Sequence, residues 1–160
     1  MPVYHYTFHA YGSWLPDRPE GYTPHGQSFK PADPAIANEY RKRMRRPETH
    51  FGDGAKQHAL QTLIDSQSLQ HFELYAMAAE PSHLHVVVAW RDEREPTRVR
   101  SQVKTSLTRA LNKHFGKRDW FVAKAGQTPV VDEAHLHELV HSYLPKHGLY
   151  WKRGDDQEDA

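Results

Sequence analysis

The run "HLHVVVAW" at residues 83–90 constrains the fold most, because it joins two histidines to an apolar stretch, Val86 to Trp90. This stretch is far shorter than the ~20 apolar residues that span a bilayer. A short apolar run that follows a turn such as Pro81-Ser82 is typical of a buried strand. Residues i and i+2 of a strand share a face, so His83 and His85 are predicted to lie side by side. A strand that enters a core therefore begins with two polar groups that need partners there.

The remaining patterns place further strands and helices around this run. Alternation over residues 3–11, "VYHYTFHAY", predicts a first strand, and residues 71–80 predict a strand that forms a hairpin with residues 83–90. Helical spacing and capping residues predict helices at 33–47, 53–68 and 97–115 and a last helix that begins after Asp132. Residues 119–126 predict a fourth strand, followed by a break from Gly126 to Pro129. The Pro- and Gly-rich segment between the first strand and the first helix predicts a loop that is functional or disordered.

This order of elements predicts an α+β fold. It favours a ferredoxin-like antiparallel sheet with helices on one face and an extra C-terminal helix that carries a tyrosine. In that topology the strands at 3–11 and 83–90 are central neighbours, which places His5 and His9 near His83 and His85. We expect one domain over residues 1–152 and a polar, disordered tail over 153–160.

Composition limits the classes of protein and of site that need to be considered. A chain of 160 residues buries about 70% of its unfolded surface, so its stability does not require a metal or a disulfide. The absence of cysteine excludes disulfides and thiolate metal sites. The first residues lack the charged and then apolar pattern of a signal peptide, and we expect a cytoplasmic protein.

Charge is distributed unevenly along a chain that is nearly neutral overall. Residues 94–124 contain nine basic residues and two acidic ones, and "RKRMRR" at 41–46 forms a second basic cluster. Much of the compensating acid lies in the final "GDDQEDA". Such segregation is compatible with a face that binds a polyanion, but also with an ordinary solvated surface.

The predicted last helix supplies a possible third ligand and a reactive group. Tyr143 lies on its apolar stripe, and His147 is one turn later on the same face. Two imidazoles on one strand can occupy neighbouring positions around a metal ion, whereas the "HLH" at 135–137 is on a helix, where residues i and i+2 diverge. The alternative is that His83 and His85 are hydrogen-bonded, partly buried histidines and that Tyr143 belongs to the core.

The motifs "PSHLHVVV" and, about sixty residues later, "HSYLPKHG" together resemble those of the His-hydrophobic-His superfamily of single-strand nucleases. Within it, the chain is similar to the small single-tyrosine transposases of bacterial insertion sequences and to the REP-associated tyrosine transposases. The segments "TFHAYGSWLPDRPEGY" and "LTRALNKHF" extend the resemblance over residues 3–152.

The resemblance implies a metal-dependent endonuclease and strand transferase that acts on single-stranded DNA, often beside a hairpin, and forms a 5′-phosphotyrosine intermediate. It makes Tyr143 the nucleophile and His83 and His85 ligands of Mg²⁺ or Mn²⁺, with Lys146 orienting the substrate. Imidazole ligands favour manganese over magnesium. His147 stands where the family commonly has Asn or Gln as the third ligand. The family also usually works as a homodimer.

In this setting the basic segment and the Pro-rich loop are candidates for DNA contacts. Cations can neutralise phosphates and aromatic rings can stack on unpaired bases. The candidate DNA-binding residues are Arg98, Arg100, Lys104, Arg109, Lys113, Tyr11 and Trp14.

Two other functions are compatible with the same residues. One is a catalytically silent or domesticated nucleic-acid-binding protein, which His147 and Pro145 favour, because a proline inside a helix ends or kinks it. The other is a hydrolytic metal phosphoesterase in which Tyr143 is only a core residue.

Overall fold

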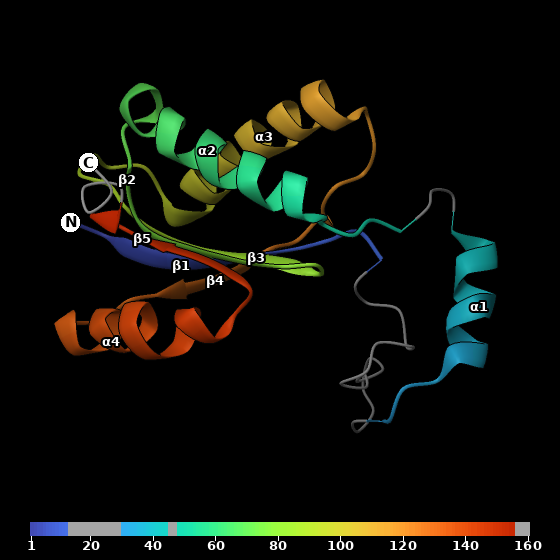
Figure 1. Cartoon of the computed structure of the whole chain (residues 1–160). Coiled ribbons are helices and arrows are strands. Elements are labelled where there is room, and N and C mark those ends of the chain that lie inside the picture. Colours follow the sequence, from blue (N-terminus) through green and yellow to red (C-terminus); the bar gives the residue numbers. More distant parts are fainter. Residues whose placement is uncertain (13–29, 45–47, 156–160) are drawn as a thin grey trace.

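The computed structural model describes residues 1–12, 30–44 and 48–155 (Figure 1). Its centre is a five-stranded antiparallel sheet in the order β4-β1-β3-β2-β5. The strands are β1 (Val3–His9), β2 (Glu73–Glu80), β3 (His83–Ala89), β4 (Gly126–Pro129) and β5 (Leu149–Lys152). The helices are α1 (Pro34–Arg43), α2 (Asp53–Gln70), α3 (Pro96–Phe115) and α4 (Glu133–Glu138), and α4 continues into two further helical turns. The predicted α+β fold is confirmed.

Strands β1 and β3 are the central neighbours, as the topology predicted. Their register pairs Thr7 with His85 and His9 with His83. The hairpin between β2 and β3 pairs Glu80 with His83, immediately beside the turn. The ends of three strands therefore meet where the His-x-His motif begins.

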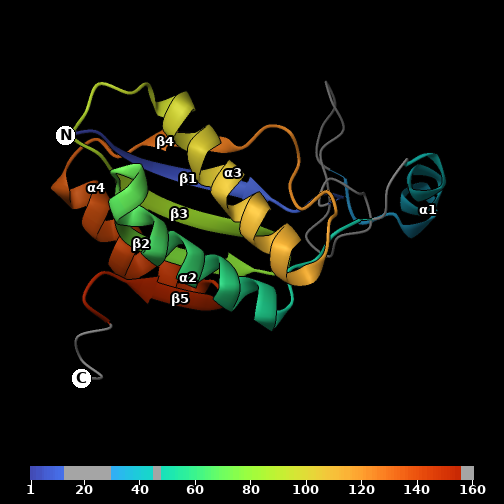
Figure 2. The same ribbon diagram turned by 90° about the horizontal axis from the view of Figure 1, so that it is seen from above.

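The two faces of the sheet carry different layers, as Figures 1 and 2 show: α2 and α3 cover one face, and α4 lies against the other. The larger core lies under α2 and α3 and takes alternate residues of β3, Leu84, Val86 and Val88. A smaller core under α4 takes Val87 from the opposite face of the same strand. Because β3 is apolar on both faces, its side-chain alternation appears only at its histidine end. The buried face of α3 consists of residues four apart, namely Val99, Val103, Leu107 and Leu111.

The predicted strand at 119–126 is wrong, and so is the predicted break from Gly126 to Pro129, because the break is strand β4. Within 119–125 only Phe121 makes a sheet bridge, to Ala10. Trp120 and Phe121 are buried in the larger core. The apolar residues of this segment therefore reflect burial in the core and not pairing in a strand. The carbonyl groups of Val122, Ala123 and Ala125 accept from side chains of α3 instead of from a neighbouring strand.

The sequence patterns missed strand β5, which pairs with β2 at the sheet edge. Its four residues, "LYWK", alternate between the two cores: Trp151 reaches the larger one and Tyr150 the smaller one. The first predicted helix starts as expected, with the Asp33 side chain accepting from the amide of Ile36, but it ends at Arg43. None of the described helices is both long enough and apolar enough to cross a membrane.

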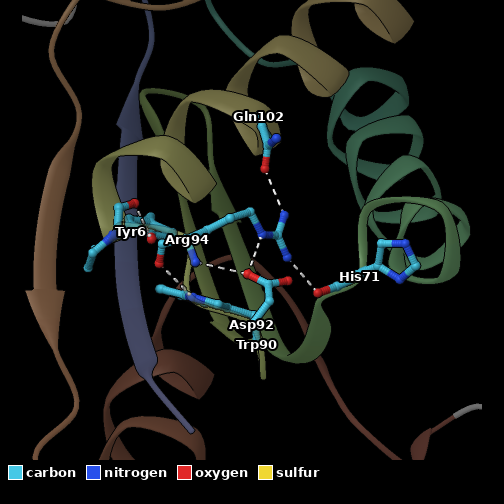
Figure 3. A network of polar contacts seen from close by, with 7 residues as sticks. Tyr6, His71, Trp90, Asp92, Arg94 and Gln102 are labelled. Atoms are coloured by element: carbon cyan, nitrogen blue, oxygen red, sulfur yellow. Dashed lines mark hydrogen bonds and ion pairs between the residues drawn. The ribbon is translucent and has the colours of Figure 1, made fainter.

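Arg94 ties the connection between β3 and α3 to the helix layer (Figure 3). Its guanidinium donates to the Asp92 carboxylate at 2.7 Å, to the Gln102 side chain at 2.7 Å and to the His71 carbonyl oxygen at 2.7 Å. Its own carbonyl accepts from the Trp90 indole at 3.0 Å. One side chain thus connects the end of β3 with both α2 and α3, which fixes the helix layer relative to the central strands.

Candidate metal and tyrosine site

Three histidines converge on the face of the sheet that α4 covers. Because residues of β3 alternate between faces, His83 and His85 lie on the side opposite Leu84 and Val86. His147 follows the last helical turn and completes the group. One ring nitrogen from each of these histidines lies within 4.8 Å of the others. The structure thus brings together the three residues that the sequence proposed as metal ligands.

His85 is the buried member of the group, with 4% of its surface exposed. Its Nδ1 lies 2.9 Å from Nε2 of His5 and 3.5 Å from the Thr7 hydroxyl. Its Nε2 is buried and has no hydrogen-bond partner within the described part of the chain. A buried nitrogen without a hydrogen-bond partner lowers the stability of the folded protein by about 1–3 kcal/mol. A metal ion on Nε2 would remove that cost, so the residues present fit such an ion.

The other two histidines each have Nδ1 in a hydrogen bond. Nδ1 of His147 lies 3.1 Å from the Tyr143 carbonyl oxygen, which can only accept, so Nδ1 carries the proton and Nε2 the lone pair. Nδ1 of His83 lies 2.9 Å from the Ser82 hydroxyl. Hydrogen bonds on the second ring nitrogen are the usual support of histidine ligands.

Burial keeps the central histidines neutral. Burial, reinforced by neighbouring histidines, lowers the pKa of His85 to about 3 and that of His5 to about 4. A neutral imidazole is the form that binds metals, so both rings are in the required state near neutral pH.

We expect the metal-free protein to lose stability as the pH falls below about 6.5. Unfolded histidine has a pKa near 6.5, so below that pH the unfolded state binds protons that folded His5 and His85 exclude. The stability that the two neutral rings contribute is fully present above pH 6.5 and is lost as the pH approaches their folded pKa values of about 4 and about 3. The check is the Tm between pH 4.5 and 8 in chelating buffer, for wild type and for His5→Phe. The variant should show the weaker pH dependence, and equal slopes would contradict the assignment.

Tyr143 is presented by an irregular end of the last helix. Helix α4 starts at Asp132, whose side chain accepts from the amide of His135 at 2.7 Å. A π-helical turn over Leu139–Tyr143 follows, in which the amide of Leu144 donates to the Leu139 carbonyl. Pro145 explains this geometry, because its ring clashes with a regular preceding turn, and widened turns of this kind are frequent at functional sites. The sequence predicted that the helix kinks or ends at Pro145, and the helical turns end at Lys146, one residue later.

The tyrosine ring is exposed next to the histidines. Tyr143 is 41% exposed, although the sequence placed it on an apolar stripe. Its ring centroid lies 4.7 Å from that of His147 and 5.7 Å from that of His85. By contrast, the Tyr150 hydroxyl donates to the Val140 carbonyl, and burial raises the pKa of Tyr150. Tyr143 is therefore the tyrosine that a substrate can reach at this site.

Gly148 and Glu80 hold the backbone beside His147. The amide of Gly148 donates to a Glu80 carboxylate oxygen at 3.0 Å. A Cβ at position 148 would lie 2.5 Å from the Ala79 carbonyl oxygen, so only glycine fits without a shift of the backbone. His147 is thus fixed by the turn before it and by the pairing of β5 with β2 after it.

The other predicted site residues are distributed more widely. Lys146 is exposed, and it lies in the short helical turn directly after Tyr143. Tyr11 is partly buried, and its backbone bonds to Trp120 and Thr49. Trp14 lies outside the described residues.

Four of the basic residues of α3 fall into two pairs, both on the helix layer opposite the histidines. Arg100 donates to the Ala125 carbonyl at 3.1 Å, and Lys104 donates to the carbonyls of Val122 and Ala123. These two cations hold the connection that leads to β4. Arg98 and Arg109 instead line a groove of about 830 Å³ between the end of α2 and α3, together with hydroxyl and amide side chains and the carboxylates of Asp92 and Glu93. Lys113 is exposed near the end of α3.

Sequence reasoning missed several residues that shape the site. It placed His5 near the motif through the alternation of β1, but not its hydrogen bond to His85. Ser82, Glu80 and Gly148 carried no signal, because their contacts depend on the register of the hairpin and on a strand that the patterns did not show. The second His-x-His lies on α4 as predicted, where the amide of Val131 donates to Nδ1 of His135 at 3.2 Å.

No protein-family model matches the sequence, and no curated protein matches it. Among solved structures, a REP-associated tyrosine transposase bound to a REP hairpin is similar, with a TM-score of 0.50 and 10% identity over 90% of this chain and 70% of that one. The chain has the fold of a tyrosine transposase. The resemblance in the motifs and the likeness in structure thus agree. A protein from Deinococcus radiodurans R1 that is assigned as a transposase is also similar, with a TM-score of 0.47 and 14% identity over 93% of this chain and 94% of that one.

Proposed function

We propose that this protein is a metal-dependent endonuclease and strand transferase that acts on single-stranded DNA beside hairpins. The observation that carries the proposal is the exposed Tyr143 ring next to three histidines whose ligand atoms lie within 4.8 Å of one another. A tyrosine transposase of the same fold, bound to a REP hairpin, supports the choice of DNA as substrate. The resemblance further suggests a homodimer.

His83, His85 and His147 are the residues that would hold a divalent ion. When bound, such an ion supplies electrostatic stabilisation of the phosphate oxygens at the reacting centre. The chain itself provides three imidazoles, two on strand β3 and one on a turn fixed by Gly148. Phosphate oxygens could fill the remaining coordination positions, which suits Mn²⁺ or Mg²⁺.

Tyr143 would act as the nucleophile. Its oxygen, after losing the phenol proton, forms a bond to phosphorus, and the bond from phosphorus to the 3′-oxygen breaks. The 3′-oxygen takes up a proton and leaves as a hydroxyl, while the 5′-phosphate stays on the tyrosine. The phosphodiester energy is kept in that covalent bond, so the step can run backward on a new 3′-hydroxyl. Lys146, exposed one turn away, would pair with the phosphate.

The test is to incubate the protein with labelled single-stranded DNA that carries candidate hairpin ends, with Mn²⁺, Mg²⁺ or EDTA. A protein–DNA band that resists denaturation and requires the metal supports the proposal. Salt-sensitive binding without cleavage would indicate a binding protein, and cleaved DNA without a covalent band would indicate hydrolysis.

We also propose that the groove beside α3 contacts the phosphate backbone. Helix α3 contains no acidic residue, and its groove residues combine arginines with Ser101, Thr105 and other hydroxyls, the side chains that usually contact phosphates. Arg98 and Arg109 are the cations suited to this contact, because Arg100 and Lys104 bind backbone carbonyls.

Replacing Arg98 and Arg109 together by Gln is expected to weaken binding of hairpin DNA about tenfold. It should also lower the slope of log K against log salt by about 2, one for each lost phosphate contact. The measurement is fluorescence anisotropy across a salt series. The control is Lys42→Gln with Arg43→Gln, which removes the same charge from α1. An equal loss in both variants would reduce the effect to net charge and contradict a specific role for the groove.

A further inference from the structure

His5 lies directly behind the candidate metal ligand that is most deeply buried. Strand β1 places it on the same sheet face as the ligand histidines, two residues from Thr7, the register partner of His85. The rings of His5 and His85 are 5.0 Å apart between centroids, with their nitrogens at 2.9 Å. The sequence resemblance assigns His5 no role, yet it is the nearer of the two side chains beside Nδ1 of His85.

We propose that His5 is a positioning residue that sets the tautomer of His85: its Nε2 accepts the proton of Nδ1 of His85, so that the lone pair of His85 is on Nε2. The proposal rests on the proposed function, because it concerns the metal held by His83, His85 and His147.

The hydrogen bond between the two rings has two possible directions, and only one leaves His85 able to bind an ion. A neutral imidazole carries one N–H. If Nε2 of His5 donated, Nδ1 of His85 would accept and the proton of His85 would be on Nε2, the buried nitrogen that has no hydrogen-bond partner within the described residues. If Nε2 of His5 accepts, His85 keeps its proton on Nδ1 and Nε2 is a ligand. The direction of this hydrogen bond thus decides whether His85 can coordinate a metal ion.

Among the described residues, few other groups are placed to fix the tautomer of His85. Within the described residues, the other neighbour of its Nδ1 is the Thr7 hydroxyl at 3.5 Å, too long for a good hydrogen bond. Nε2 has no protein partner there. A hydrogen bond to the ring nitrogen that does not bind the metal typically changes the metal affinity of a histidine site by 10- to 100-fold.

The experiment is calorimetric titration of Mn²⁺ into wild type, His5→Phe and His5→Gln. Phenylalanine preserves the ring but cannot accept, and we expect it to weaken binding at least tenfold. The Gln amide oxygen can accept, and we expect it to restore most of the affinity. His137→Phe, on the exposed side of α4, is the control and should bind as wild type does. Tm values in EDTA identify a variant that fails to fold.

The outcomes separate this inference from the proposed function. If wild type does not bind Mn²⁺, the metal site itself is refuted. If wild type binds and His5→Phe binds equally well, the metal site stands and the positioning role of His5 is overturned. Nitrogen-15 NMR of Zn²⁺-loaded wild type gives a reading that needs no variant. Coordination through Nε2 of His85 with a proton on Nδ1 supports the role, and coordination through Nδ1 overturns it.

Discussion

Replacing Tyr143 by Phe is expected to abolish the covalent protein–DNA band while hairpin DNA still binds within about twofold of wild type. The change removes one oxygen atom from a ring that is 41% exposed, so it creates no cavity in the core. Without that oxygen no bond to phosphorus can form, and at least about a thousandfold loss of adduct is expected, as for removal of a catalytic nucleophile. The check is denaturing gel analysis of labelled DNA in Mn²⁺, with anisotropy to measure binding.

Tyr150→Phe is the matched control for this result. It makes the same chemical change seven residues later, but it removes a hydroxyl that donates to the Val140 carbonyl. It should lower stability by about 1 kcal/mol and leave adduct formation intact. If the adduct persists in Tyr143→Phe and vanishes in Tyr150→Phe, Tyr150 is the nucleophile. If Tyr143→Phe still cleaves DNA, the hydrolytic phosphoesterase is the better assignment.

Replacing His83 by Ala is expected to remove metal binding and DNA cleavage together. Two imidazoles would remain, of which only His85 lies on a strand, and we expect Mn²⁺ affinity to fall by more than about 100-fold. Cleavage should fall in parallel, because the tyrosine loses the electrostatic support of the ion. The measurements are calorimetric titration with Mn²⁺ and the covalent-band assay at a fixed metal concentration.

The second His-x-His of the chain supplies the control. His137→Ala changes the same residue type in the same tripeptide, but on the exposed side of α4. It should preserve both metal affinity and cleavage. Unchanged cleavage in His83→Ala would refute the metal role, and equal losses in the two variants would point to a general effect on folding.

The fold could be predicted largely because its determinants are local. Alternation in β1 and the apolar β3 identify the two central strands, and the order of elements then restricts the sheet to few arrangements. Local patterns failed where residues are buried without belonging to a strand, or belong to a strand without being apolar. Trp120 and Phe121 are apolar because they fill the core, whereas β4 is polar because it lies at the sheet edge. Strand β5 is too short for periodicity to show.

The candidate site was predictable in its residues but not in its geometry. A His-x-His on a strand is sufficient to place two candidate ligands, and spacing from the tyrosine suggested a third candidate. Pro145 predicted an interruption of the helix, but not a π turn that exposes Tyr143 beside His147. The hydrogen bond between His5 and His85 joins residues eighty positions apart, so it depends on the strand register and has no local signature.

The fixed backbone around Gly148 links the C-terminal edge of the sheet thermodynamically to the candidate metal site. His147 can approach His83 and His85 only when residues 147–152 are docked on β2, where the Glu80 carboxylate and the Ala79 carbonyl confine Gly148. The free energy of docking this edge is therefore part of any metal affinity, and by reciprocity an ion bound to His147 strengthens the docking by the same amount. Strand β5 would thus act as a reporter of occupancy at a site to which it contributes no ligand.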